Sequence, residues 1–212
     1  MKKSKTAIII VLLILFFSIF FFFFPLNEVA KNLPIVKVFY RNTVLEVTSP
    51  NSKALVKIDG KEYGSTPVNI TNLVAGEYQI EMIKESSSEG FYKPHIFNIW
   101  LTKNSTSRIN MEIGPDDNLH GFELYYTEDN TGDVNMGKLT LTSNASDTKA
   151  YIDNEYINKT PITNHILNKG EYTIKMESEG YEDLEFPVVV SEGHILHIKG
   201  HQFPIPVSFD IN

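Results

Sequence analysis

The chain contains no cysteine, which excludes a disulfide framework and any thiolate metal site. Its folded part must therefore be held by packing and backbone hydrogen bonds alone. Tryptophan occurs once, and no segment carries the Gly-rich phosphate loop, nucleophile elbow or paired carboxylates typical of an active site. These absences predict a protein that is not an enzyme and has no cofactor, no catalytic residue and no metal ligand.

Positive charge is scarce beyond the first few residues. The formal net charge is −7, and Lys2, Lys3 and Lys5 precede a long apolar run, so the remainder of the chain carries −10. A surface of this sign repels the phosphates of nucleic acids and of anionic lipids. Nucleic acid is therefore not expected as a partner.

One long hydrophobic run, residues 7–24, contains only one polar side chain, that of Ser18. A helix of eighteen residues rises about 27 Å, close to the hydrocarbon thickness of a bilayer. Residues 1–26 are therefore predicted to form a cytoplasmic tip and a single-pass transmembrane anchor, and residues 27–42 a linker. The preceding lysines favour a cytoplasmic N-terminus, which places the rest of the chain outside the cell membrane.

A secretory signal peptide is the alternative for this run, because it also begins with lysines and continues with apolar residues. A cleaved signal needs small residues before the cut. The one plausible cut, after Ala30, has Glu28 near the position where a small residue is required. An uncleaved signal anchor is the favoured prediction.

The remainder of the sequence repeats itself with a constant offset of 94 residues, as from Ile58 to Ile152. Such self-similarity indicates a tandem duplication. The first copy contains Ile58-Asp59-Gly60, Thr66-Pro67 and Gly76-Glu77-Tyr78, and the second contains Ile152-Asp153-Asn154, Thr160-Pro161 and Gly170-Glu171-Tyr172. Duplication is common in spacers, adhesins and binding modules, so it also favours a non-catalytic role.

Both copies have the patterns of short strands. Residues 45–48 and 78–82 alternate apolar with polar side chains, as expected of strands with one buried face. Asp59-Gly60 and Asp153-Asn154 are suited to two-residue hairpin turns with positive φ. The sequence therefore predicts an all-β fold of two small β-sandwiches behind the anchor. The expected segments are sandwich 1 at 43–113, an acidic linker at 114–137, sandwich 2 at 138–203 and a C-terminal tail at 204–212.

These landmarks resemble the PEGA domain, a small β module of prokaryotic cell-envelope and surface-layer-like proteins. The resemblance rests on residues 48–60, the Gly64-Ser65-Thr66-Pro67 step and the turn before Tyr78, together with their second-copy counterparts. The second copy departs at residues 144–148, where the turn that names the family is replaced. The resemblance implies an extracytoplasmic β-sandwich without catalytic residues, and it carries no ligand.

Specific recognition is expected in features that the copies do not share. Phe91 and Tyr92 in the long loop 86–94 are the predicted ligand-binding residues, because aromatic side chains on loops offer large contact areas. Trp100 is expected to be buried, because residues 96–101 are largely apolar on both faces.

Two groups of polar residues resemble metal sites only in part, and no metal site is predicted. Asp129 and Asp133 fall in a run that lacks the glycine and closing glutamate of a calcium loop, since Val134 stands at the glycine position. His197 and His201 share one face of a strand and His194 lies on the other, so three-fold zinc coordination is not expected.

The predicted function is that of a membrane-anchored, non-enzymatic cell-envelope protein. Its two modules would act as spacer, adhesion or envelope-polymer-binding domains. Two alternatives remain open: a protein-docking subunit or sensor-like partner of a membrane complex, and a carbohydrate-binding accessory module. Possible partners are the membrane, an envelope polysaccharide or another envelope protein.

Overall fold

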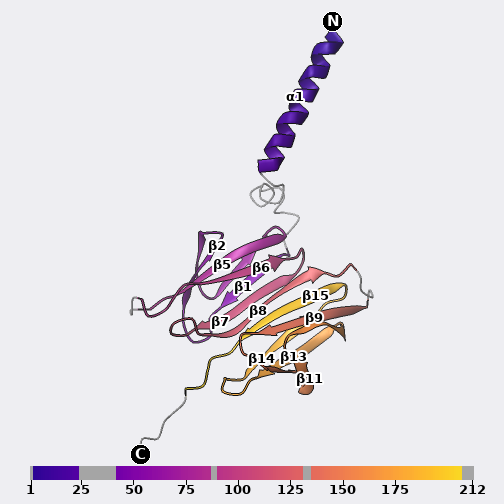
Figure 1. The fold of residues 1–212 in the computed structure, drawn as a ribbon. Helices are drawn as coiled ribbons and strands as arrows, with labels where there is room; N and C mark the ends of the chain where they lie inside the picture. Colours follow the sequence, from indigo (N-terminus) through magenta and orange to yellow (C-terminus); the bar gives the residue numbers. More distant parts are fainter. Residues whose placement is uncertain (1, 24–41, 87–89, 131–134, 207–212) are drawn as a thin grey trace, which may run out of the picture.

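The computed structural model describes residues 2–23, 42–86, 90–130 and 135–206. Within these residues there is one helix, α1 (Lys2–Phe23), and the fifteen strands that follow form the β region (Figure 1). Side chains of α1 are described for residues 9–19 and 22 only, and all of them are exposed. Within what is described, no helix is both long enough and apolar enough to cross a membrane. Most of the predicted linker 27–42 lies outside the described residues.

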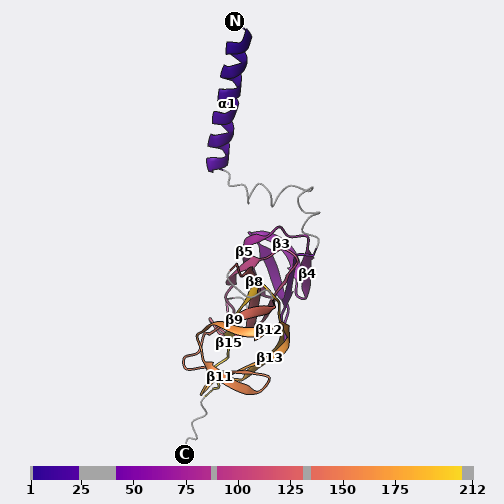
Figure 2. The ribbon, with the colours of Figure 1, turned by 90° about the vertical axis from the view of Figure 1, so that its right-hand side faces the viewer.

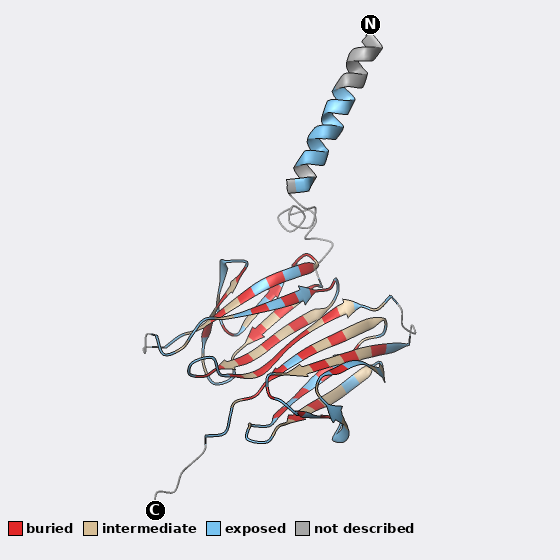
Figure 3. Cartoon of the chain, viewed as in Figure 1, coloured by how far each residue is buried: buried red, intermediate tan, exposed pale blue. Residues whose placement is uncertain are grey.

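The first copy folds as two packed sheets, as predicted for a sandwich. Three strands belong to a large central sheet: β1 (Val44–Thr48), β4 (Val68–Thr71) and β7 (Thr106–Ile113). Four form a smaller sheet in the order β3 (Lys61–Ser65), β2 (Ala54–Ile58), β5 (Gly76–Lys84) and β6 (His95–Leu101). Buried side chains alternate along these strands (Figure 3), so one face of each sheet supplies the first core cluster.

The second copy repeats this arrangement strand for strand. Its central-sheet strands are β9 (Met136–Ser143), β12 (Ile162–Asn168) and β15 (His194–His201). Its smaller sheet has the order β11 (Glu155–Lys159), β10 (Lys149–Ile152), β13 (Gly170–Glu177) and β14 (Leu184–Val190). A second core cluster fills the space between them. The predicted all-β, tandem architecture is therefore confirmed for the region after α1.

The prediction of a linker at 114–137 has to be corrected. Within this segment β8 (Leu119–Glu128) is a ten-residue strand that pairs with β7 on one side and with β15 on the other. The central sheet thus runs through both copies in the order β12-β9-β15-β8-β7-β1-β4. The acidic residues suggested solvent exposure, but most of β8 is buried: Phe122, Leu124 and Tyr126 belong to the second core cluster, and Leu119 on the other face belongs to the first.

The two cores lie on opposite faces of this shared sheet. Ile109 of β7 is opposite Glu123 and faces the first cluster, whereas Ile198 of β15 is opposite Leu124 and faces the second. Residues 123 and 124 are neighbours on β8 and therefore point to opposite faces. Since β7 and β15 both run antiparallel to β8, the copies are related by an approximate two-fold axis along β8. The small sheets consequently lie on either side of the central strands (Figures 1 and 2).

The repeated residues form equivalent contacts in both copies. Asp59 and Asp153 have φ values of 47° and 50°, and each begins a turn with a second positive-φ residue, which confirms the predicted hairpins. Their Oδ1 atoms accept the amides of Gln79 at 3.0 Å and Thr173 at 2.8 Å. Each side chain thus ties its turn to the adjacent strand. The following Thr-Pro peptide bonds, 66–67 and 160–161, are both cis.

Tyr78 and Tyr172 also play matching roles, with one difference. The Tyr78 hydroxyl donates to the carbonyl of Val74 at 2.9 Å, and the Tyr172 hydroxyl donates to that of Asn168 at 3.0 Å. Tyr78 is buried, whereas Tyr172 is only partly buried against the second cluster. The main contribution of Tyr172 is therefore the hydrogen bond to its turn, and it contributes less to the core than Tyr78 does.

Candidate functional site

Two grooves flank the central sheet, each beside the edge strand of a small sheet. The β6 groove has a volume of about 330 Å³ and is lined by Ile96, Asn98, Glu123, Tyr125, Thr140 and His197, among others. The β14 groove has a volume of about 610 Å³ and lies on the opposite face, where its lining includes Glu46, Arg108, Glu112, Phe122, Glu185 and Pro187. The duplication thus provides two related concave sites that differ in chemistry.

The central-sheet side of the β14 groove contains an ion pair. The Arg108 Nε atom lies 3.0 Å from Glu46 Oε2 across the paired strands β7 and β1. The equivalent positions of the second copy hold Thr140, 94 residues after Glu46, and His197. The β6 groove therefore presents a hydroxyl and a ring where the β14 groove is occupied by its own charges.

His197 and Tyr125 form a neutral wall of the β6 groove. Their rings stack with centroids 4.8 Å apart and an interplanar angle of 11°, and His197 Nε2 lies 2.8 Å from the Thr127 hydroxyl. Burial lowers the pKa of His197, because it penalises the charged imidazolium. Burial, followed by the nearby Glu123, raises the pKa of the Tyr125 hydroxyl. Both rings are thus kept uncharged.

The charges of the β6 groove are unequally exposed. Glu123 Oε1 lies 3.4 Å from His201 Nε2 and 3.5 Å from Lys199 Nζ. The side chains of Glu123 and His201 are 8% and 9% exposed, whereas that of Lys199 is 52% exposed. An incoming group would therefore meet a cationic Lys199 above a buried carboxylate.

The two predicted ligand-binding residues differ in environment. Phe91 is 53% exposed, and its ring lies edge-on to that of Tyr92 with centroids 5.0 Å apart. Tyr92 packs partly against the first cluster, has Lys84 Nζ 4.2 Å from its ring centroid and forms a bridge with Asp116. Residues 87–89 of this loop lie outside the described residues. A ligand-binding role for the pair stays a prediction, and the geometry favours Phe91 over Tyr92.

The groups considered for metal binding are engaged elsewhere. Asp129 Oδ2 pairs with Lys138 Nζ at 2.8 Å, and its side chain is 4% exposed. Asp133 and Val134 lie outside the described residues. His194 Nδ1 contacts the Glu192 carbonyl at 2.7 Å, and the other two histidines of this strand have the contacts given above. In the part of the chain that the structure describes, no three His, Asp or Glu residues converge on a metal position.

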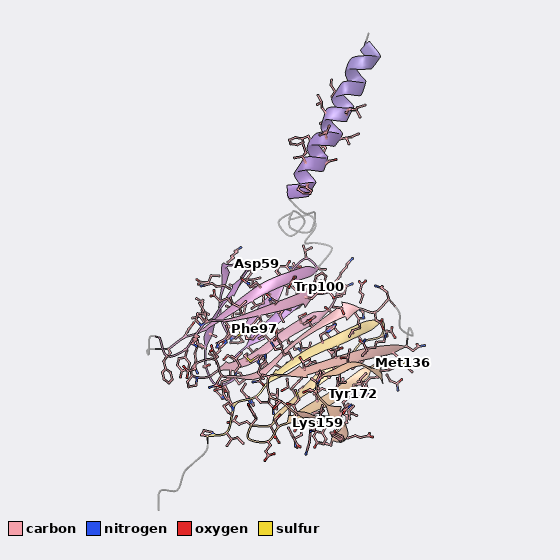
Figure 4. All side chains as sticks on the ribbon, in the orientation of Figure 1. Asp59, Phe97, Trp100, Met136, Lys159 and Tyr172 are labelled. Atoms are coloured by element: carbon pink, nitrogen blue, oxygen red, sulfur yellow. The ribbon has the colours of Figure 1, made fainter. Side chains whose placement is uncertain are left out.

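The prediction that Trp100 is buried is wrong. Trp100 and Ile96 are 43% and 58% exposed, on the outer face of β6 (Trp100 is labelled in Figure 4). The opposite face, with Phe97, Ile99 and Leu101, fills the first core. The outer face of β6 is uncovered because, among the residues that the structure describes, no third layer packs on this small sheet. The β6 groove could not be predicted from the sequence, because its residues lie far apart along the chain.

The fold and the grooves define a class of protein: a duplicated β-sandwich module joined by a shared sheet. A family model for the PEGA domain matches residues 42–116 and 136–202. The chain therefore belongs to the PEGA domain family, with two copies in tandem, as the resemblance predicted. A comparison with curated proteins gave no match.

Proposed function

We propose that this chain is a membrane-anchored, non-enzymatic cell-envelope protein whose two PEGA domains act as one rigid extracytoplasmic unit. The observation that carries the proposal is the central sheet, in which β8 hydrogen-bonds to a strand of each copy. Two domains joined by a flexible linker would tumble separately, whereas a shared sheet fixes their distance and orientation. Such a unit is suited to hold a binding surface at a set position.

The anchor is supported by the sequence of the first 24 residues. Residues 7–24 are apolar except for Ser18, and most of them belong to the helix α1. Lysines precede this run, which favours retention of the N-terminus in the cytoplasm. The β region then lies on the outer side, where a chain without cysteine folds independently of the redox conditions.

Two surface features support a binding role over that of a spacer. The exposed ring of Phe91 favours contact with an envelope polysaccharide, because aromatic faces stack on sugars. The β6 groove favours docking of another envelope protein. A spacer needs neither feature, so loss of attachment on substitution at one of them would assign the role.

The test of topology uses the absence of cysteine from the wild-type chain. Ser4→Cys places a single thiol before the apolar run, and Glu155→Cys places one on the exposed start of β11. A membrane-impermeant maleimide should label Glu155→Cys in intact cells and Ser4→Cys only after lysis, with the wild-type chain as the unlabelled control. The reverse pattern would overturn the orientation, and a soluble product that begins near Lys31 would indicate a cleaved signal peptide.

A further inference from the structure

The outer edge of β6 presents unpaired backbone groups to the β6 groove. The Trp100 carbonyl accepts a bond from Ser107 Oγ at 3.4 Å, so it points away from β5, the strand with which β6 pairs. Backbone groups two and four residues earlier point the same way in an antiparallel strand, which places those of Asn98 and Ile96 on this edge. Neither residue has a backbone hydrogen bond on this side to another described residue.

The corresponding edge of the second copy is blocked. In the first copy, Asn98 of β6 is opposite Gln79 of β5. In the second copy, the equivalent pair is Pro187 of β14 opposite Thr173 of β13. Proline has no amide to donate to a further strand, and Glu185 adds a charge to this edge. No charged residue occurs in β6, His95–Leu101, so the protection found in one copy is missing from the other.

We propose that the β6 edge binds an extended segment as a fifth strand of its small sheet, and that residues 207–212 of a second copy of this chain are that segment. The inference goes beyond the proposed anchoring and rigid display. A volume of about 330 Å³ admits one strand.

The sequence of this segment is complementary to its surroundings in the proposed position, which are the polar surface of the central sheet on one side and the apolar outer face of β6 on the other. Residues 207–212 read Val-Ser-Phe-Asp-Ile-Asn, which alternates apolar and polar side chains. With the polar side turned toward the central sheet, Asp210 faces the half-exposed Lys199 and the hydroxyl of Thr140. The apolar side then covers the exposed Ile96 and Trp100 on the outer face of β6.

Residues 207–212 of a second copy can reach the β6 edge more readily than the same residues of the molecule itself. Pro204 pairs with Tyr181, and the Ile205 amide donates to the Gly180 carbonyl at 2.8 Å. These contacts hold the start of the tail against the loop between β13 and β14, which belongs to the small sheet on the face opposite the β6 groove. Six residues span at most about 20 Å, which favours binding in trans.

The test measures binding of a labelled synthetic peptide, residues 205–212, to the purified full chain by fluorescence anisotropy. Asn98→Pro copies the blocked edge of β14 and should weaken binding roughly tenfold, the effect of losing about one edge hydrogen bond. Asn98→Ala, which changes an exposed side chain but keeps the backbone amide, is the matched control and should leave the affinity unchanged. A peptide of the same composition with its apolar residues adjacent should also bind roughly tenfold more weakly, because its pattern is lost.

A second variant keeps the proposal testable if Asn98→Pro fails to fold. Ile96→Ser changes a side chain that is 58% exposed, so it should weaken binding of the peptide without lowering the melting temperature of the protein. In sedimentation the wild-type chain should associate with rising concentration, and Asn98→Pro should not. Equal binding by Asn98→Pro and the wild type, equal binding of both peptides, or a monomeric wild type would overturn the proposal. Those results would leave the thiol-labelling test of topology unaffected.

Discussion

At the scale of single residues, burial favours the neutral form of two histidines: His95 in the first copy and His197 in the β6 groove. Burial lowers the pKa of His95 more than the nearby Asp117 raises it, and the His95 Nε2 atom is buried without a hydrogen-bond partner among the described residues. Burial likewise lowers the pKa of His197, which stacks on Tyr125. Protonation of either ring must therefore oppose folding.

The pH dependence of stability follows from these pKa shifts. A histidine whose pKa is lower in the folded than in the unfolded state stabilises the fold fully above the unfolded value, about 6.5, and loses that contribution as the pH falls through it. The urea midpoint should thus fall from about pH 7.5 to about pH 5.5. His197→Phe should reduce this fall, since it removes one of the two groups. An identical fall in the variant would contradict the assignment.

At the scale of elements, β8 is the strand on which both copies depend, and Gly121 permits its close approach to β7. Gly121 has a φ of 136°, and a Cβ atom built there would lie 1.9 Å from the Asn110 carbonyl oxygen. A side chain at this position therefore requires the backbone of one strand to move. The glycine is needed for the pairing that joins the copies.

Gly121→Ala should accordingly destabilise the whole β region. We expect a loss of roughly 2–5 kcal/mol in the free energy of unfolding, from backbone strain and the backbone clash together. Gly180→Ala is the matched control, since Gly180 also has positive φ, 78°, but no atom within 4 Å of an added Cβ. It should cost about 1 kcal/mol. Equal effects in chemical denaturation would show that the approach of β7 and β8 is not constrained.

At the scale of the whole molecule, two separate core clusters share one sheet. Residues of β8 contribute to both, with Leu119 in the first cluster and Leu124 in the second. Loss of either half would expose one face of β8 and leave unpaired the backbone groups of β8 that had bonded to the lost strand, β7 or β15. The halves should therefore unfold together, in contrast to the independent folding expected of domains on a linker.

Cooperative unfolding can be tested with a substitution in one half and a reporter in the other. Met176→Ala removes a fully buried side chain from the second cluster and should cost roughly 2–5 kcal/mol. Trp100, the sole tryptophan, reports on the first half. Its fluorescence midpoint in urea should shift together with the far-UV circular dichroism midpoint. A tryptophan midpoint that stays at the wild-type value would show that the halves unfold separately.

The local features of this protein and its internal repeat could be predicted from the sequence alone. The turns at Asp59 and Asp153 and the strands that contain residues 45–48 and 78–82 were predictable, because turn residues and alternating side chains act over a few positions. The constant spacing also identified the PEGA domains. These features depend on short-range chemistry that is the same in both copies.

Which strands are central and which lie at the edges of the sheets depends on the folded arrangement of the whole chain. Residues 122–126 have the composition of a strand, but their pairing on both sides, and hence the joining of the copies, depends on partners distant in sequence. The same long-range pairing leaves Trp100 exposed and brings Tyr125 against His197, 72 positions later. Alternation indicates that one face of a strand is buried, while the pairing of strands determines what covers the other face and the edge.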